Sequence, residues 1–214
     1  MTAKRNIARA LATRWHPGPP SLFRRGTVGL LGGSFNPAHE GHLYIARTAM
    51  ERLGLDEVWW LVSPGNPLKP NDGMAPLPER FASAVSRAGA GRMRVTDIER
   101  TLGTRYTAEA VKRLQARYPR LSFVWMMGAD NLAQIPAWKE WSSIFHTVPV
   151  AVLARPHYLE RALSGAASAR FRDGRLPERA ARRLARHRPP AWIFIHSRLV
   201  AASASAIRAL KRAS

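Results

Sequence analysis

Two histidines three positions apart, His39 and His42, are the residues of this chain best suited to chemistry. They lie in the segment 32–42, GGSFNPAHEGH, which follows a short apolar run and precedes a segment with helical apolar spacing. A strand, a tight turn and a helix N-terminus form an anion site, because free N–H groups and the positive end of the helix dipole point the same way. The two imidazoles share one face of the first helical turn. The pattern predicts phosphate chemistry; the alternative is that the histidines merely decorate a junction between loop and helix.

The segment 32–42 resembles the H-x-G-H signature of the nucleotidyltransferase superfamily. Its longer form, G-x-F-N-P-x-H-x-G-H, resembles the nicotinate mononucleotide adenylyltransferases of NAD synthesis. The resemblance implies transfer of the adenylyl group of ATP to nicotinate mononucleotide, which forms deamido-NAD and pyrophosphate. The residues it assigns within the segment are Gly33, Ser34, Phe35, His39 and His42 for ATP and Asn36 for the acceptor.

Apolar runs and helical patterns alternate along the chain from Thr27 onward. Such alternation favours an α/β fold with a mostly parallel sheet and helices on both faces, as in Rossmann-like nucleotidyltransferases. Ligands of these sheets bind at the carboxyl ends of the strands. Neither G-x-G-x-x-G nor the P-loop motif occurs, so the phosphate turn is of a different kind. The predicted strands are 27–31, 57–63, 93–98, 121–127, 148–154 and 191–195, and the predicted helices are 41–53, 78–88, 107–117 and 203–212.

The length of 214 residues predicts a single domain, 26–214, after a basic N-terminal extension, and the resemblance implies that this is a nucleotidyltransferase domain. The extension, 1–25, is expected to be flexible, with a short amphipathic helix carrying Ile7, Leu11 and Trp15; a transit peptide is the alternative. The chain has no cysteine, which excludes a disulfide framework and fits a reducing cytoplasm. It has neither an apolar run long enough to span a bilayer nor a hydrophobic signal core, so a cytoplasmic location without membrane contact is expected.

The net charge of +20 is concentrated in two flanks. Residues 1–25 carry six Lys and Arg and no acid, and residues 155–190 carry ten basic residues against three acids. The stretch 26–154 is nearly balanced, with fourteen basic and eleven acidic residues. The flanks lack interleaved aromatics and a glycine-rich RNA motif, so solvated arginine-rich helices are favoured over a specific nucleic-acid partner. The positive field would still attract anionic substrates.

Two further segments are assigned by the resemblance. The family has a basic residue facing the phosphates in the loop after the second strand, and Lys69 occupies this loop here; a solvated lysine is the alternative. The segment 99–107 is similar to a family segment that ends in Ser-Tyr-Thr, whose threonine contacts the pyridine carboxylate. Thr107 matches that threonine, while Arg105 replaces the serine. Thr107 is also a candidate helix cap, and the two roles do not exclude each other.

The fourth strand leads into the pattern G-x-D-x-L…P-x-W-x-x-W, which is similar to the nicotinate branch of the family. Asp130 of this pattern suits a ribose or a metal ion, or it caps the helix that follows. The resemblance implies that Trp138 stacks on the pyridine ring, an electron-poor ring that an indole face suits. Trp141 is interpreted as core packing.

The last predicted helix begins with Ser203, Ser205 and Arg208, a weakened form of the family signature I-S-S-T-x-I-R. Hydroxyls at a helix N-terminus can hold phosphate oxygens, and an arginine adds a charge-assisted fork. The alternative is an ordinary serine-capped helix that bears one arginine. By the resemblance, these residues bind ATP and its departing pyrophosphate.

The expected reaction is an in-line attack of the acceptor phosphate on the α-phosphorus of ATP, with His39, His42 and Arg208 as catalytic residues. Mg²⁺ is expected to be held mostly by phosphates and water rather than by a protein cage. A histidine-zinc site is not favoured, because His39 and His42 lack a third ligand at suitable spacing and the neighbouring glycines favour phosphate. Rival interpretations are a sister enzyme acting on nicotinamide mononucleotide, phosphopantetheine or glycerol phosphate, and a basic RNA-associated protein. The sequence leaves the oligomeric state open, a homo-oligomer included.

Overall fold

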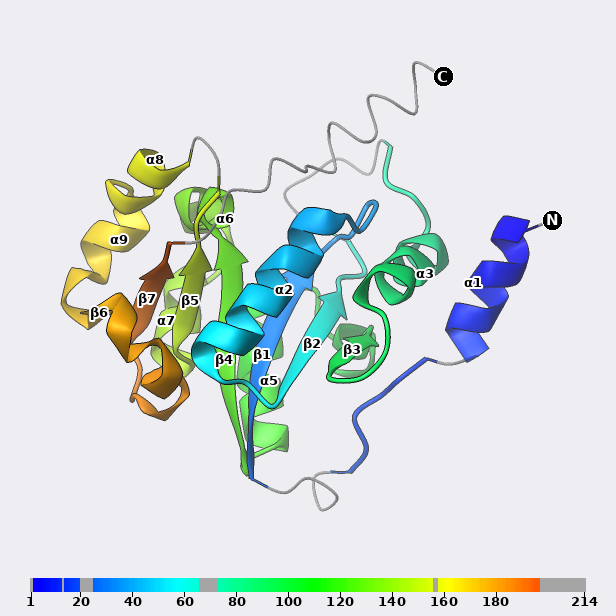
Figure 1. The fold of residues 1–214 in the computed structure, drawn as a ribbon, viewed down its shortest axis with the longest axis horizontal. Helices are drawn as coiled ribbons and strands as arrows, with labels where there is room; N and C mark the ends of the chain where they lie inside the picture. Colours follow the sequence, from blue (N-terminus) through cyan, green and yellow to red (C-terminus); the bar gives the residue numbers. More distant parts are fainter. Residues whose placement is uncertain (1, 13, 20–24, 66–72, 156–157, 197–214) are drawn as a thin grey trace.

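The structure is a computed structural model that describes residues 2–12, 14–19, 25–65, 73–155 and 158–196. The described residues form a seven-stranded parallel sheet in the order β3-β2-β1-β4-β5-β7-β6 (Figure 1). The strands are β1 (Gly26–Gly33), β2 (Glu57–Val62), β3 (Met93–Thr96), β4 (Leu121–Gly128), β5 (Val150–Leu153), β6 (Arg175–Leu176) and β7 (Trp192–Ile195). Six of them were predicted from apolar runs; β6, two residues long, was not.

Helices cover both faces of the sheet, which confirms the predicted α/β class (Figure 1). Side chains alternate along each strand, so Trp59 and Leu61 of β2 pack into one core while Val58 and Trp60 pack into the other. One core includes α2 (Glu40–Leu53), α3 (Leu77–Ala88) and the 3-10 helix η4 (Glu178–Arg186). The other includes α5 (Thr107–Arg117), α6 (Ala129–Gln134), α7 (Trp141–Thr147), α8 (Leu159–Leu163) and α9 (Ala166–Arg170).

The remaining described elements are short connections or lie before the sheet. They are α1 (Thr2–Ala12), α4 (Ile98–Thr101), η2 (Ile135–Ala137) and η3 (Arg172–Gly174). The predicted strand over 93–98 ends at Thr96, because Ile98 already begins α4. The helix predicted over 203–212 lies outside the described residues.

The parallel register brings the carboxyl ends of neighbouring strands to one edge of the sheet. Gly33 of β1 is paired with Val62 of β2, and Gly128 of β4 with Leu153 of β5. The segments that follow these strands therefore start side by side, and this edge is where ligands of such sheets bind.

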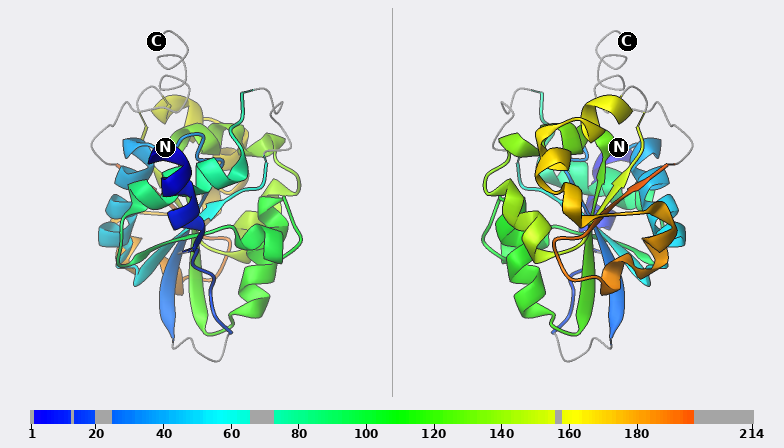
Figure 2. Two further views of the ribbon diagram at one scale, coloured as in Figure 1. Left: turned by 90° about the vertical axis from the view of Figure 1, so that its right-hand side faces the viewer. Right: turned by 90° about the vertical axis from the view of Figure 1, so that its left-hand side faces the viewer.

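The described part of the N-terminal segment, residues 2–12 and 14–19, contacts the domain, and the flexibility of the extension stays a prediction. Helix α1 packs beside α3 (Figures 1 and 2). The Arg14 guanidinium lies 3.2 Å from the buried carboxylate of Asp97, and Trp15 meets Trp59 edge to face at 5.1 Å. These contacts fix the described part of the segment against the sheet edge at β2 and β3.

Across the ranges that the structure describes, no helix has both the length and the apolar character needed to cross a membrane.

Candidate active site

The two histidines lie together where β1 turns into α2. His39 is the N-cap residue of the helix and His42 is its third residue. Their ring centroids are 3.9 Å apart, and the backbone N–H of His39 donates to Nδ1 of His42 at 3.2 Å. Because Nδ1 of a neutral His42 accepts this bond, its proton is assigned to Nε2, which is left as a donor. Both residues line a cavity of about 710 Å³, a size typical of ligand sites.

Both imidazoles are neutral at neutral pH. Burial, followed by the charges of Arg155 and Arg87, lowers the pKa of His39 to about 4. Burial, followed by His39 and Arg155, lowers the pKa of His42 well below its usual 6.5. The histidines are therefore suited to bind phosphate as N–H donors rather than as fixed cations, and an arriving anion would raise both pKa values.

The turn between β1 and α2 is held by residues that lie behind the cavity. Phe35 has a left-handed φ of 47°, is buried, stacks on Trp60 at 5.2 Å and meets His42 edge to face at 4.9 Å. The Asn36 side chain donates to the carbonyl of Gly73 and accepts from the N–H of Ala75. Neither residue is among those that line the cavity. In the structure Phe35 and Asn36 hold the turn, and their contacts with the substrates stay a prediction.

A buried arginine that the sequence analysis missed joins the two loops at this edge. The Arg80 guanidinium donates to the carbonyls of Ser34, Ser63 and Pro64 at 2.8–3.0 Å, and its Nε donates to Ala75. Arg80 is 2% exposed. One cation therefore fixes the phosphate turn after β1 to the loop after β2.

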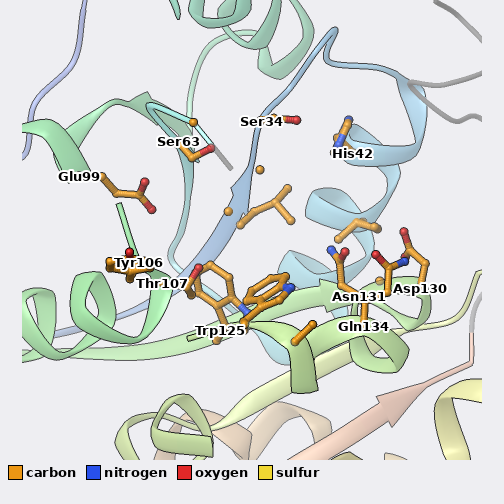
Figure 3. Close-up of a pocket in the computed structure, with 18 of the residues that line it drawn as sticks. Ser34, His42, Ser63, Glu99, Tyr106, Thr107, Trp125, Asp130, Asn131 and Gln134 are labelled. Carbon is orange, nitrogen blue, oxygen red and sulfur yellow. The ribbon is translucent and has the colours of Figure 1, made fainter. Parts of the chain in front are cut away.

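The opposite end of the cavity is formed by the start of α5 (Figure 3). Thr107 lines the cavity, as predicted for an acceptor contact, but it is the first residue of the helix and not its cap. Thr104 instead accepts from the N–H of Tyr106 at 3.1 Å and donates to Glu109 at 2.7 Å. The prediction of Thr107 as a cap is therefore wrong, because the N-cap residue of α5 is Tyr106, one residue earlier.

Asp130 lines the cavity from the first turn of α6, beside an arginine from the segment that follows β5. Its carboxylate lies 3.4 Å from Nε of Arg155, and the helix is capped by Gly128, so Asp130 is not the cap. A Cβ on Gly128 would stand 2.3 Å from Oδ1 of Asp130 and 3.0 Å from Nε of Arg155. A side chain at position 128 would therefore require the side chain of Asp130 or Arg155 to move.

The two tryptophans of the W-x-x-W pattern have different places. Trp138 follows η2 and lines the cavity, as a group stacking on a ligand ring would. Trp141 begins α7 and packs edge to face on Phe145 and Phe171, which confirms its core role. The two indoles are not on one helical face, because Trp138 precedes the helix.

The structure brings most of the predicted site residues to this one cavity. Those that line it are Gly33, Ser34, His39, His42, Thr107, Asp130 and Trp138. Lys69, Ser203, Ser205 and Arg208 lie outside the described residues. Lining residues that were not predicted include Glu99, Tyr106, Trp125, Asn131, Gln134, Lys139, Arg155 and Tyr158. Arg155 could have been found, because it comes directly after the predicted strand 148–154. The other residues have no motif or spacing that would have indicated a site.

The phosphate end offers one carboxylate to a metal ion, that of Asp130, which is already paired with Arg155. Within the described ranges, no three His, Asp or Glu side chains are grouped so that they could hold a metal.

Fold and site together define a class. The sheet, the histidine pair at a helix N-terminus and the adjoining cavity are those of a nucleotidyltransferase, and a model of the cytidylyltransferase-like family matches residues 30–210. A relative from Cereibacter sphaeroides (strain ATCC 17023) is 51% identical over 185 residues, 86% of this chain and 97% of the relative. One from Roseobacter denitrificans is 52% identical over 181 residues, 85% of this chain and 90% of the relative. Both are named "Probable nicotinate-nucleotide adenylyltransferase". The chain belongs to the nicotinate-nucleotide adenylyltransferase family.

A solved structure with the same fold is the nicotinic acid mononucleotide adenylyltransferase of Plasmodium falciparum, complexed with NaAD. Its TM-score is 0.61 at 15% identity, and the match covers 86% of this chain and 83% of that one. At this identity the likeness concerns the fold alone.

Proposed function

We propose that the protein transfers the adenylyl group of ATP to nicotinate mononucleotide and releases pyrophosphate. The observation that carries this proposal is one cavity with the His39–His42 pair at one end and Thr107 and Trp138 elsewhere on its wall. The family membership supports the same reaction, because relatives about half identical to this chain (51% and 52%) carry that activity in their names.

The phosphate end supports in-line transfer. An oxygen of the acceptor phosphate forms a bond to the α-phosphorus of ATP. The bond between the α-phosphorus and the oxygen that it shares with the β-phosphorus breaks, and pyrophosphate leaves with the electron pair. Such transfers depend on alignment and charge neutralisation rather than on a covalent intermediate. His39 and His42 donate to phosphate oxygens, the N-terminus of α2 adds its dipole, and Arg155 adds a positive charge.

The other end of the cavity supports a pyridine nucleotide as acceptor. The indole of Trp138 offers a face for the ring, and the free N–H groups at the start of α5 suit a carboxylate beside Thr107. This arrangement favours nicotinate mononucleotide over phosphopantetheine or glycerol phosphate, which have no aromatic ring.

The roles of the residues outside the described ranges belong to the same proposal. Ser203, Ser205 and Arg208 would bind the departing pyrophosphate at the last helix, and Lys69 would face the phosphates from the loop after β2. Their types suit this work, because hydroxyls and cations both stabilise phosphate oxygens.

Mg²⁺ is the metal that we propose for the reaction. Since the described phosphate end supplies a single, already paired carboxylate in Asp130, the ion would be held mainly by substrate phosphates and water. When bound, it would neutralise phosphate charge. Arg155 and the two imidazoles supply the protein's own share of that neutralisation.

The experiment is pyrophosphate release from ATP and Mg²⁺, with nicotinate or nicotinamide mononucleotide as acceptor. We expect turnover that depends on the acceptor, with the higher kcat/KM for the acid. Faster turnover with the amide would reassign the acceptor, and no turnover with either would overturn the proposal.

A further inference from the structure

Glu99 is a buried acid on the cavity wall to which the proposed mechanism gives no role. Its side chain belongs to α4, is 3% exposed and lines the cavity. Its Oε2 has no hydrogen-bond partner within the part of the chain that the structure describes. Figure 3 shows the carboxyl directed into the cavity between Ser63 and Tyr106. An unpartnered buried carboxyl costs stability, so a ligand that pairs with it would offset that cost.

The position of Glu99 ties it to one end of the cavity. In Figure 3 it lies on the side of Tyr106 and Thr107, and His42 and Asp130 lie on the opposite side. Helix α5, eleven residues long, begins at Thr107 without a side-chain cap. Glu99 therefore faces the subsite in which the proposed function places the carboxylate of the pyridine ring, and not the phosphate subsite.

We infer that Glu99 is a specificity-determining residue: in its protonated form it donates a hydrogen bond to the carboxylate of nicotinate mononucleotide, and in its ionised form it repels that carboxylate. The amide of nicotinamide mononucleotide carries no charge to repel, and its N–H groups can donate to an ionised Glu99. This inference rests on the proposed function. It adds that the preference for acid over amide is set by a proton on the protein.

Burial is what keeps that proton on the carboxyl near neutral pH. It raises the pKa of Glu99 to about 7, with no contribution from a neighbouring charge. A bound carboxylate would raise this pKa further, so affinity for the acid should fall as pH rises above about 7, by at most tenfold per unit. Affinity for the amide should not fall with it.

Other titratable or charged groups line the cavity or lie near Glu99 and need a control. Those on the cavity wall are Arg105, Tyr106, Lys139, His39, His42, Asp130 and Arg155. Those nearby are Arg100 within α4, Asp97 directly before it with Arg14 paired to it, and Glu109 in α5. The guanidinium groups keep their charge throughout, and the lowered pKa values of the two histidines lie below the range in question. The acceptor phosphate is common to acid and amide, so the ratio of their KM values cancels its titration.

The test measures KM and kcat for both acceptors from about pH 6 to about pH 8.5. We expect KM for the acid, divided by KM for the amide, to rise by up to about tenfold per unit above pH 7 in the wild type. In Glu99→Gln, which keeps the shape and cannot ionise, this ratio should not change with pH. Glu51→Gln makes the same charge change on the exposed surface of α2 and should keep the wild-type profile.

A second measurement uses the wild type alone, so it does not depend on the folding of a variant. Calorimetry in two buffers of different ionisation enthalpy, with α,β-methylene ATP present, reports protons taken up on binding. At pH 7 the acid should take up about half a proton more than the amide. A KM ratio that is constant in the wild type, one that still varies in Glu99→Gln, or equal proton uptake would overturn the inference. If neither the acid nor the amide serves as acceptor, both the proposed function and the inference are overturned. Turnover without these pH effects overturns the inference alone.

Discussion

At the scale of single residues, the proposed chemistry depends on the His39–His42 pair. Each imidazole is buried, and its pKa is lowered because desolvation disfavours the charged form. Neutral imidazoles hold phosphate through oriented N–H donors that need no reorganisation as charge moves from the α-phosphate to the leaving group. The bond from the N–H of His39 to Nδ1 of His42 fixes that orientation.

Removing one donor tests this role. His42→Ala should lower kcat by about 10²–10³-fold, because a preorganised donor to developing charge is lost. Circular dichroism should remain that of the folded wild type, since His42 lies in the first turn of α2 and lines the cavity, and is not a member of either hydrophobic core. His187→Ala, an exposed histidine remote from the cavity lining, serves as the matched control. Wild-type activity in His42→Ala would refute the role of the pair.

Glu99 makes a separate prediction about stability. Its pKa is about 7 in the folded protein against 4.5 for an ordinary glutamate, so the unfolded state releases a proton over a range in which the folded state retains it. Stability is therefore lost as pH rises from about 4.5 to about 7. Glu99→Gln should then exceed the wild type in free energy of unfolding by on the order of 3 kcal/mol at pH 8 and by little at pH 4.5. Urea denaturation at the two pH values checks this, and an equal difference at both would contradict it.

At the scale of elements, the strand ends decide which residues meet. β1 ends in Gly32 and Gly33, and a Cβ on Gly32 would stand 2.4 Å from the ring of Trp125 on β4. The Trp125 indole lines the cavity beside the phosphate turn. The absence of a side chain at Gly32 is thus a packing requirement at the base of the site.

Gly32→Ala tests that requirement. The added methyl should displace the Trp125 ring and lower the free energy of unfolding by about 1–3 kcal/mol, with a larger fractional loss of kcat/KM than of expression. Gly26→Ala, at the other end of β1, meets only ordinary contacts at 3.4 and 3.6 Å and is the matched control. Equal thermal midpoints and activities for both variants would show that the close approach to Trp125 has no effect.

The elements that could be predicted from the sequence are those whose pattern lies in consecutive residues. Six strands are rich in apolar residues because both faces of a parallel sheet are covered, and the phosphate turn has its own residue pattern. Interactions between distant segments could not be predicted in this way. Arg80 donates to carbonyls of Ser34, Ser63, Pro64 and Ala75. Arg155, which follows β5, pairs with Asp130, which follows the neighbouring strand β4. From the sequence alone, Arg80 and Arg155 cannot be distinguished from ordinary surface arginines, because their partners are known only from the fold.

Local rules also failed where two residues compete for one role. Thr107 has the type expected of a cap, yet Thr104 holds the turn, because its hydroxyl reaches both Tyr106 and Glu109. Phe35 and Asn36 match the family signature, but the left-handed φ at Phe35 turns its ring into the core behind His42. A motif therefore identifies the turn without stating which of its side chains face the ligand.

At the scale of the whole molecule, charge and substrate agree. The net charge of +20 favours the approach of nucleotides, which are anionic. The N-terminal segment, which is basic, is attached to the sheet edge through Arg14 and Trp15 rather than extended from it. The alternative of an RNA-associated protein would instead require RNA binding that weakens with salt and survives His42→Ala, without turnover of ATP.

The central claim is that the α-phosphate of ATP moves to the acceptor. It is tested most directly by incubating the protein with nicotinate mononucleotide, Mg²⁺ and ATP labelled on the α-phosphorus, then separating the products. We predict that the label appears in deamido-NAD, in equal amount to the pyrophosphate released. Label that stays in ATP, or that appears in AMP without a dinucleotide product, would contradict adenylyl transfer by this site.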